Sequence, residues 1–174
     1  MHTRRPIHTR TLSWVGIWFV LAILLPDKVV LAGAGTIEGA VKITINEDQI
    51  AYGDWIRVLL VKEKITLPEY TDNSKWNKYE RMDRIISAHM AFYKHVMEKI
   101  NDPNCLVATT LTRPDGTFKF ADVSPGLYYV VITFPSMIKG YKVAWQVPVS
   151  LTAGQTRYVE LTHDNFALPT YCRE

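Results

Sequence analysis

The stretch RPDGTFKF at residues 113–120, followed by PGLYYV at residues 125–130, decides the fold class. Asp-Gly favours a tight turn, because glycine adopts positive φ without a Cβ clash and aspartate hydrogen-bonds its own turn. Phe118 and Phe120 then alternate across a short strand, and a second Pro-Gly turn leads into a run of strand-forming residues. Two turns and two strands therefore fit inside about twenty residues, which predicts a specific β architecture.

Residues 113–132, RPDGTFKFADVSPGLYYVVI, resemble the strand-turn-strand motif of carboxypeptidase regulatory-like domains, the transthyretin-like or prealbumin-like β-sandwiches. Residues 36–41 are similar to the opening xIxGxV strand of that family, and residues 56–61 are similar to its second strand. The resemblance covers residues 35–62 and 105–162. It implies a sandwich fold and little about function, because this scaffold serves many roles.

Alternation of apolar and polar residues predicts seven strands separated by turn signals. The predicted strands are residues 36–45, 55–62, 106–112, 117–121, 126–134, 141–151 and 155–162. Residues 46–54 are predicted as a polar loop, and Pro148 indicates an edge or a bulge in the sixth strand. We expect a mainly β, seven-stranded transthyretin-like sandwich over residues 35–163, with residues 164–174 as a C-terminal tail.

An insert at residues 68–103, which the family pattern lacks, separates the second and third predicted strands. Apolar residues recur there every three or four positions, which predicts one amphipathic helix of about 25 residues. Asp72, Asn73 or Ser74 would cap its start, and Asp102-Pro103 would end it. The predicted apolar face consists of Trp76, Tyr79, Met82, Ile86, Met90, Tyr93, Met97 and Ile100.

Two interpretations of this apolar helix face are open. In the resembled family the side chains of Leu59, Val61, Tyr129 and Val131 would point outward from one sheet, yet all four are apolar. The helix would then fold back over them as a third layer. Alternatively it would dock another protein. The residues of that possible interaction surface are Trp76, Tyr79, Met82, Ile86, Met90 and Tyr93.

Residues 1–32 are predicted to be a cleaved signal peptide that directs the chain to the periplasm or outside the cell. Three arginines precede an apolar run from Leu12 to Leu25, and Val30-Leu31-Ala32 forms a small-residue cleavage site; cleavage after Ala34 fits nearly as well. An uncleaved membrane anchor is the alternative. However, fourteen helical residues would span about 21 Å, short of a hydrocarbon core of roughly 30 Å. Contact with the membrane would therefore be limited to transient export.

Removal of this segment leaves equal numbers of basic and acidic side chains. Residues 1–32 hold four of the 20 Lys and Arg and one of the 17 Asp and Glu, which leaves 16 of each sign. A nucleic-acid partner requires clustered surplus bases to displace counterions from phosphate. The balance therefore argues against nucleic-acid binding.

Cys105 and Cys172 are the only cysteines, and export favours a disulfide between them. The bridge would close a loop of about 68 residues and contribute on the order of 4 kcal/mol in the chain-entropy model. Two free thiols are the alternative, since sequence alone does not bring their Cα atoms within bonding range.

The histidines offer only weak metal or catalytic signals. His95 and Glu98 form an H-x-x-E pattern, but nothing around them resembles a metallocarboxypeptidase catalytic domain. His89 and His95 are six positions apart and so lie on different faces of a helix. His163-Asp164 fits the end of the last strand. The C-terminus also lacks the Tyr-Arg-Gly-Ser motif of hydroxyisourate hydrolases, and His163 lacks the His-x-His partner of intradiol dioxygenases.

We therefore predict that the chain has no catalytic, cofactor-binding or metal-binding residues and is not an enzyme. We expect instead an exported module with a structural or protein-interaction role. One alternative is binding of carbohydrate or cell envelope through exposed aromatic residues, with candidates Trp55, Trp76, Tyr141 and Trp145. A second alternative is metal-linked activity through His89, His95 or His163. The partner and the oligomeric state stay open.

Export predicts a defined mature N-terminus. Intact-mass analysis of protein from the periplasmic or secreted fraction should show a chain beginning at Gly33 or Gly35. A chain that retains Met1, or that stays mainly in the cytoplasm, would contradict the prediction and remove the basis for an oxidised cysteine pair.

Overall fold

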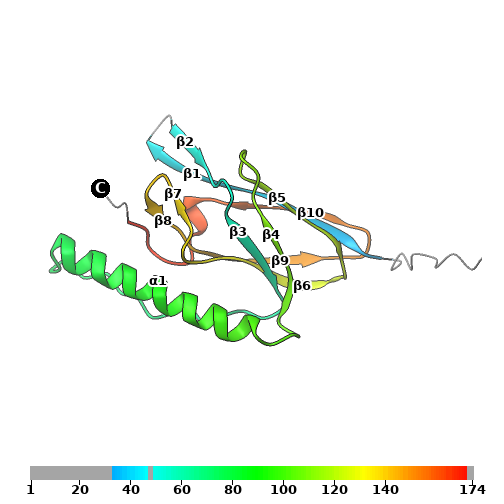
Figure 1. The fold of residues 1–174 in the computed structure, drawn as a ribbon, viewed down its shortest axis with the longest axis horizontal. Helices are drawn as coiled ribbons and strands as arrows, with labels where there is room; N and C mark the ends of the chain where they lie inside the picture. The colour runs from blue at the N-terminus through cyan, green and yellow to red at the C-terminus, as the bar shows by residue number, and fades with distance from the viewer. Residues whose placement is uncertain (1–32, 47–48, 172–174) are drawn as a thin grey trace, which may run out of the picture.

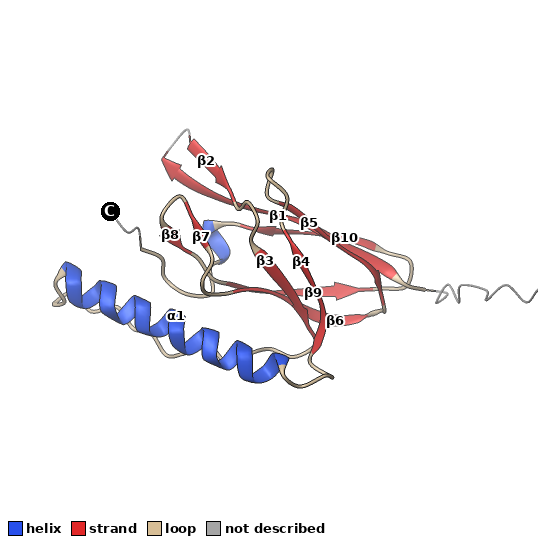
Figure 2. Ribbon diagram, in the orientation of Figure 1, coloured by secondary structure: helices blue, strands red, loops and turns tan. Residues whose placement is uncertain are grey.

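The computed structural model describes residues 33–46 and 49–171, which form a mainly β structure with one long helix (Figures 1 and 2). The elements, in chain order, are β1 (Gly35–Asn46), β2 (Gln49–Tyr52), β3 (Arg57–Val61), α1 (Lys78–Ile100), β4 (Leu106–Leu111), β5 (Thr117–Val123), β6 (Gly126–Ile132), β7 (Met137–Ile138), β8 (Tyr141–Lys142), β9 (Trp145–Leu151), β10 (Thr156–Leu161) and a short 3-10 helix (His163–Asn165).

Two four-stranded sheets make the sandwich. The first has the order β10-β1-β2, with β5 also paired to β1, and the second has the order β4-β3-β6-β9. β1 and β10 are parallel, whereas the other described pairs are antiparallel. β9 is an edge strand, as Pro148 predicts, because proline cannot donate to a neighbouring strand.

The side chains predicted to face inward fill the space between the sheets. The first core includes Ile56, Val58, Leu60, Tyr128, Val130 and Ile132, together with Ile37, Val41, Phe118, Phe120 and Trp145. These two layers of buried apolar side chains confirm a β-sandwich at the level of architecture.

The Asp115-Gly116 turn has the backbone conformation that its residues favour. Gly116 has φ of 77°, and a Cβ at this position would lie 2.4 Å from the carbonyl oxygen of Val41. The side chain of Asp115 accepts a hydrogen bond from the backbone N–H of Thr117 at 3.0 Å. The Gly116 carbonyl accepts from Val41 N–H at 2.9 Å, so the turn is also bonded to β1. Only glycine meets both the φ and the space requirement.

The number of strands differs from the prediction, because ten strands rather than seven occur in the described residues. β2 lies in the predicted polar loop, where Ala51 is buried in the core and strand pairing continues along β1. β7 and β8 flank Lys139-Gly140, whose φ values of 48° and 86° suit a tight hairpin turn. Consequently α1 follows the third strand and not the second.

The helix starts later than predicted, although its 23 residues agree with the predicted length. It starts at Lys78 after the N-cap Asn77, whose side chain accepts from Glu80 N–H at 3.0 Å, while Glu80 accepts from Asn77 N–H at 2.9 Å. This reciprocal capping box satisfies two N–H groups at the helix start. The predicted caps at residues 72–74 therefore precede the helix by several residues.

α1 lies along the outer face of the β4-β3-β6-β9 sheet as a third layer (Figure 1). Leu59, Val61 and Val131, which the alternation directs outward, are buried beneath it, and Tyr129 is half-buried. The helix and its flanking segments complete this second core with Ile65, Ala88, Phe92, Val96, Cys105, Ala144 and Leu168.

The prediction of the buried helix face is wrong, because the observed buried face is shifted by about one residue along the chain. The buried helical positions are Ile85, Ala88, His89, Phe92 and Val96. Tyr79, Met90 and Met97 are exposed, and Met82, Ile86 and Tyr93 are half-buried along the flank. The helix carries two adjacent apolar stripes, and the stripe with the small Ala88 lets its backbone approach the sheet closely. The longer methionine and tyrosine side chains remain beside that contact.

Substitutions on the two stripes should separate their roles. Phe92→Ala should destabilise the monomer by about 3–5 kcal/mol, because it removes a fully buried aromatic side chain and leaves a cavity. Met90→Ala, two positions away on the exposed stripe, should change stability by less than about 0.5 kcal/mol. Chemical denaturation of both variants measures the difference, and equal small changes would contradict the packed third layer.

Candidate functional site

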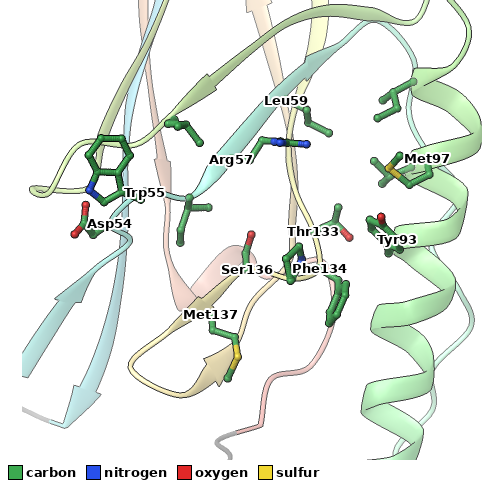
Figure 3. Close-up of a pocket in the computed structure, with 15 residues that line it drawn as sticks. Asp54, Trp55, Arg57, Leu59, Tyr93, Met97, Thr133, Phe134, Ser136 and Met137 are labelled. Carbon is green, nitrogen blue, oxygen red and sulfur yellow. The ribbon is translucent and has the colours of Figure 1, made fainter.

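An open groove of about 550 Å³ lies where the C-terminal half of α1 meets one end of the sandwich (Figure 3). In this view Trp55 lies on one side and Tyr93 and Met97 of α1 on the other, with Leu59 of β3 between them. The lining residues are Asp54, Trp55, Ile56, Arg57, Leu59, Tyr93, Val96, Met97, Ile100, Leu111, Thr133, Phe134, Pro135, Ser136 and Met137.

The turn before β3 holds Trp55 at the rim. Trp55 has φ of 54°, a left-handed conformation that is rare for a bulky residue, and its side chain is 69% exposed. The next residue is fixed, because Ile56 N–H donates to Thr112 Oγ1 at 2.8 Å and Thr112 N–H donates to the Ile56 carbonyl at 2.9 Å. Ile56 is buried while Trp55 points to solvent, so the turn presents a large aromatic ring without support from the core.

The connection between β6 and β7 forms the opposite part of the lining. Phe134 meets the ring of Tyr93 edge to face, with centroids 5.6 Å apart, and Lys142 Nζ lies 4.1 Å from the Phe134 centroid. Ser136 N–H donates to the Thr133 carbonyl at 3.2 Å and closes the turn. These contacts fix the connection against the helix, so the groove depends on the insert for its shape.

Exposed apolar side chains gather in this groove. Trp55, Leu111, Met137 and Met97 are 69%, 47%, 42% and 37% exposed, respectively, and all four line it. They come from the turn before β3, from β4, from β7 and from α1. Convergence of this kind is typical of a binding surface, whereas a scattered exposed residue needs no explanation.

Few polar groups interrupt the apolar lining. Asp54 and Arg57 carry opposite charges, and neither side chain makes a hydrogen bond or ion pair within residues 33–46 and 49–171. Thr133 Oγ1 is buried, with no hydrogen-bond partner in the described structure. The groove thus combines a mostly apolar surface with two opposite charges that have no partner in the described part of the chain.

The predicted interaction surface on the helix contributes to the groove only in part. Of its six residues, Tyr93 lines the groove. Trp76 packs on Tyr70 at a centroid distance of 6.5 Å and lies under the Arg84 guanidinium at 5.5 Å. Met82, Ile86, Met90 and Tyr79 continue along the outer flank of α1, so a role for this stripe in binding stays a prediction.

Most of the groove cannot be recognised from the sequence. Arg57, Leu111, Phe134 and Met137 were assigned to strands or turns, and no periodic pattern connects positions so far apart in the chain. Trp55 was identified as a candidate aromatic. Of the other three candidates, Trp145 is fully buried, with its Nε1–H donating to the Thr162 carbonyl at 2.8 Å, while Trp76 and Tyr141 are half-buried.

The structure keeps the three described histidines, His89, His95 and His163, apart and gives each of them a partner. His89 Nε2 donates to the Pro169 carbonyl at 2.8 Å, and His95 Nδ1 donates to the Thr66 carbonyl at 2.8 Å. His163 pairs with Asp164 at 3.0 Å near the end of β10. Among the described residues no group of three His, Cys, Asp or Glu side chains could hold a metal ion.

The predicted disulfide is not tested here, because Cys172 lies outside the described residues, as does the predicted signal peptide at residues 1–32. Cys105 is fully buried in the second core, directly before β4. Within the described part of the chain, none of the helices has the length and hydropathy of a membrane crossing.

Several solved structures have a similar arrangement. A candidate carbohydrate-binding protein of Pseudomonas aeruginosa is 15% identical with a TM-score of 0.41, over 76% of this chain and 90% of that one. A minor pilin of Streptococcus agalactiae is 11% identical with a TM-score of 0.44, over 82% and 48%, respectively. The major pilin SpaD of Corynebacterium diphtheriae is 14% identical with a TM-score of 0.38, over 74% and 32%.

The chain spans less than half the length of either pilin. No protein-family model matches the sequence. No curated protein matches it either.

His89 should make stability depend on pH. Burial lowers its pKa and the charge of Lys142 lowers it further, while the hydrogen bond to Pro169 opposes the shift. The folded-state pKa of His89 lies below its unfolded value of about 6.5. The contribution of His89 to stability is therefore fully present above that pH and declines as the pH falls. Denaturation between about pH 5 and pH 6.5 should give a shallower pH slope for His89→Gln. The control Ser87→Ala, at an exposed position of the same helix, removes no group that titrates in this range and should keep the wild-type slope.

Proposed function

We propose that this chain is an exported, non-enzymatic β-sandwich module of the carboxypeptidase regulatory-like type that binds a protein partner through the groove beside α1. The observation that carries the proposal is the convergence of four exposed apolar side chains, from four separate elements, on this one groove. A soluble monomer gains nothing in stability from exposing them, and a partner that covers them gains apolar burial.

The chemistry of the lining favours a protein segment with apolar side chains. Trp55 would contribute most, because tryptophan is enriched among binding hot spots and a partner that covers the groove would bury its largely exposed ring. Met97 and Met137 would adapt to the shape of the partner, since methionine is unbranched and polarisable. The free charges on Asp54 and Arg57 would pair with backbone or side-chain groups and fix the direction of the bound segment.

The same groove fits a polysaccharide less well. Hydroxyl-rich ligands require several hydrogen-bonding groups around an aromatic platform, and here the remaining lining is mainly aliphatic. Binding of an apolar segment would bury the same surface without leaving polar ligand groups unpaired.

Site-specific photocrosslinking in exporting cells tests the proposal. A photoreactive phenylalanine derivative in place of Met137 should give a discrete protein adduct, and Trp55→Ala in the same chain should remove that adduct. Truncation of a hot-spot tryptophan typically costs about 2 kcal/mol or more, or roughly thirtyfold in Kd. Trp55 is largely exposed, so its removal should leave the melting temperature nearly unchanged.

The control places the same photoreactive residue at Lys119, on the outer face of the other sheet. It should not give the Met137 adduct, because Lys119 pairs with Glu38 and does not line the groove. No adduct from Met137, or an adduct that survives Trp55→Ala, would overturn the proposed docking site.

A further inference from the structure

The β10-β1-β2 sheet lies on the side of the sandwich away from α1 (Figure 2). Its outer face carries two exposed tyrosines. Tyr158 of β10 is opposite Glu38 of β1, and Tyr52 of β2 is opposite Lys42 of β1. Glu38 and Lys42 are four residues apart, so both lie on one face of the strand and both tyrosines share that face. Tyr158 is 60% exposed and Tyr52 is 50% exposed.

Neither tyrosine contributes to the core. Their hydroxyls make no hydrogen bond, and their rings make no ring contact, within the described part of the chain. In contrast Tyr128, which is buried, donates from its hydroxyl to the Ser124 carbonyl at 2.7 Å. The two exposed rings are therefore free to stack on a ligand.

Charged side chains between and around the tyrosines neutralise one another. Lys42 Nζ lies 2.8 Å from Glu160 Oε1, and Lys119 Nζ lies 2.9 Å from Glu38 Oε1. The hydrogen bond with Glu160 is the main cause that raises the pKa of Lys42, so the ammonium group of Lys42 stays protonated near neutral pH. The outer face thus carries many hydrogen-bond donors and acceptors, and these two ion pairs add no net charge to it.

A shallow hollow adjoins the Lys42–Glu160 pair. It has a volume of about 240 Å³, and six of its seven lining side chains are polar. They are Lys42, Thr44, Glu160, Thr162, His163 and Asp164, with Ile50 as the apolar member. A ligand that stacks on Tyr52 or Tyr158 would meet hydroxyl, carboxylate, ammonium and imidazole groups beside it.

The spacing of the tyrosines indicates an extended ligand. Their strands are separated by two inter-strand distances, about 10 Å, and their β1 partners by four residues, about 13 Å along the strand. The two Cα atoms are therefore roughly 16 Å apart by this geometry. Both tyrosines also act electrostatically on Lys42, so the two side chains flank the Lys42–Glu160 pair. A chain of several sugar rings would span the distance between the two Cα atoms.

We propose that the outer face of the β10-β1-β2 sheet is a second binding site, for a neutral polysaccharide that stacks on Tyr52 and Tyr158. Aromatic rings bind the C–H faces of pyranose rings, and the paired charges between them hydrogen-bond to ring hydroxyls. Charge balance disfavours nucleic acid and anionic membranes, which need surplus cations. The site is independent of the groove, since none of its residues lines that surface.

Binding of the exported chain to insoluble cellulose, insoluble chitin and soluble starch tests this site. Depletion from solution measures the first two, and retardation in a starch-containing native gel measures the third. At least one of these polysaccharides should bind, and Tyr52→Ala and Tyr158→Ala should each weaken that binding by about tenfold. Tyr158→Phe should retain most of the binding, because it keeps the stacking ring.

Trp55→Ala is the matched control, because it removes an exposed aromatic residue from the groove and should leave polysaccharide binding unchanged. Equal melting temperatures of the variants would show that each folds. Absence of binding to all three polysaccharides, or equal loss in Trp55→Ala, would overturn the proposal. Self-association that depends on Tyr52 and Tyr158, measured by sedimentation without polysaccharide, would overturn it in favour of contact between two copies of the chain.

Discussion

The rest of the structure depends on the need to cover the outer face of β3 and β6. These neighbouring strands are apolar on both faces, so one set of side chains fills the sandwich and the other would be left in water. Leu59, Val61 and Val131 belong to the second set. Apolar burial contributes roughly 25 cal/mol per Å², which makes a covering layer strongly favourable. α1 supplies that layer directly from the chain that follows β3.

The same arrangement creates the groove. A straight helix meets a twisted sheet along only part of its length, so the surfaces diverge toward the end of the sandwich. Phe134 contacts Tyr93 at this divergence, and Trp55 marks the open side. The other sheet faces water with paired charges and two unsupported tyrosines. The molecule therefore has two chemically distinct surfaces on opposite layers, one apolar and concave, the other polar and flat.

Part of the candidate groove could be predicted from the sequence. Trp55 follows a polar segment and precedes an alternating strand, so its exposure fits local pattern. On the other sheet, the exposure of Tyr158 could also be predicted from the alternation in β10, because Val159 and Leu161 face the core. Tyr52 could not be found this way, because its segment contains no clear period and becomes a strand only by pairing with β1. The other groove residues meet through packing of segments that are distant in sequence.

Period-two alternation and the Asp-Gly turn determined the sandwich, the inward side chains and the need for a third layer, because these follow from strand geometry within a few residues. Helical periodicity determined that the insert at residues 68–103 contains one amphipathic helix, whereas its start at Lys78 was not predicted. Only tertiary structure decided which apolar stripe is buried. Two stripes lie about 100° apart, and close approach at Ala88, Phe92 and Val96 selects between them by packing against particular side chains of the sheet.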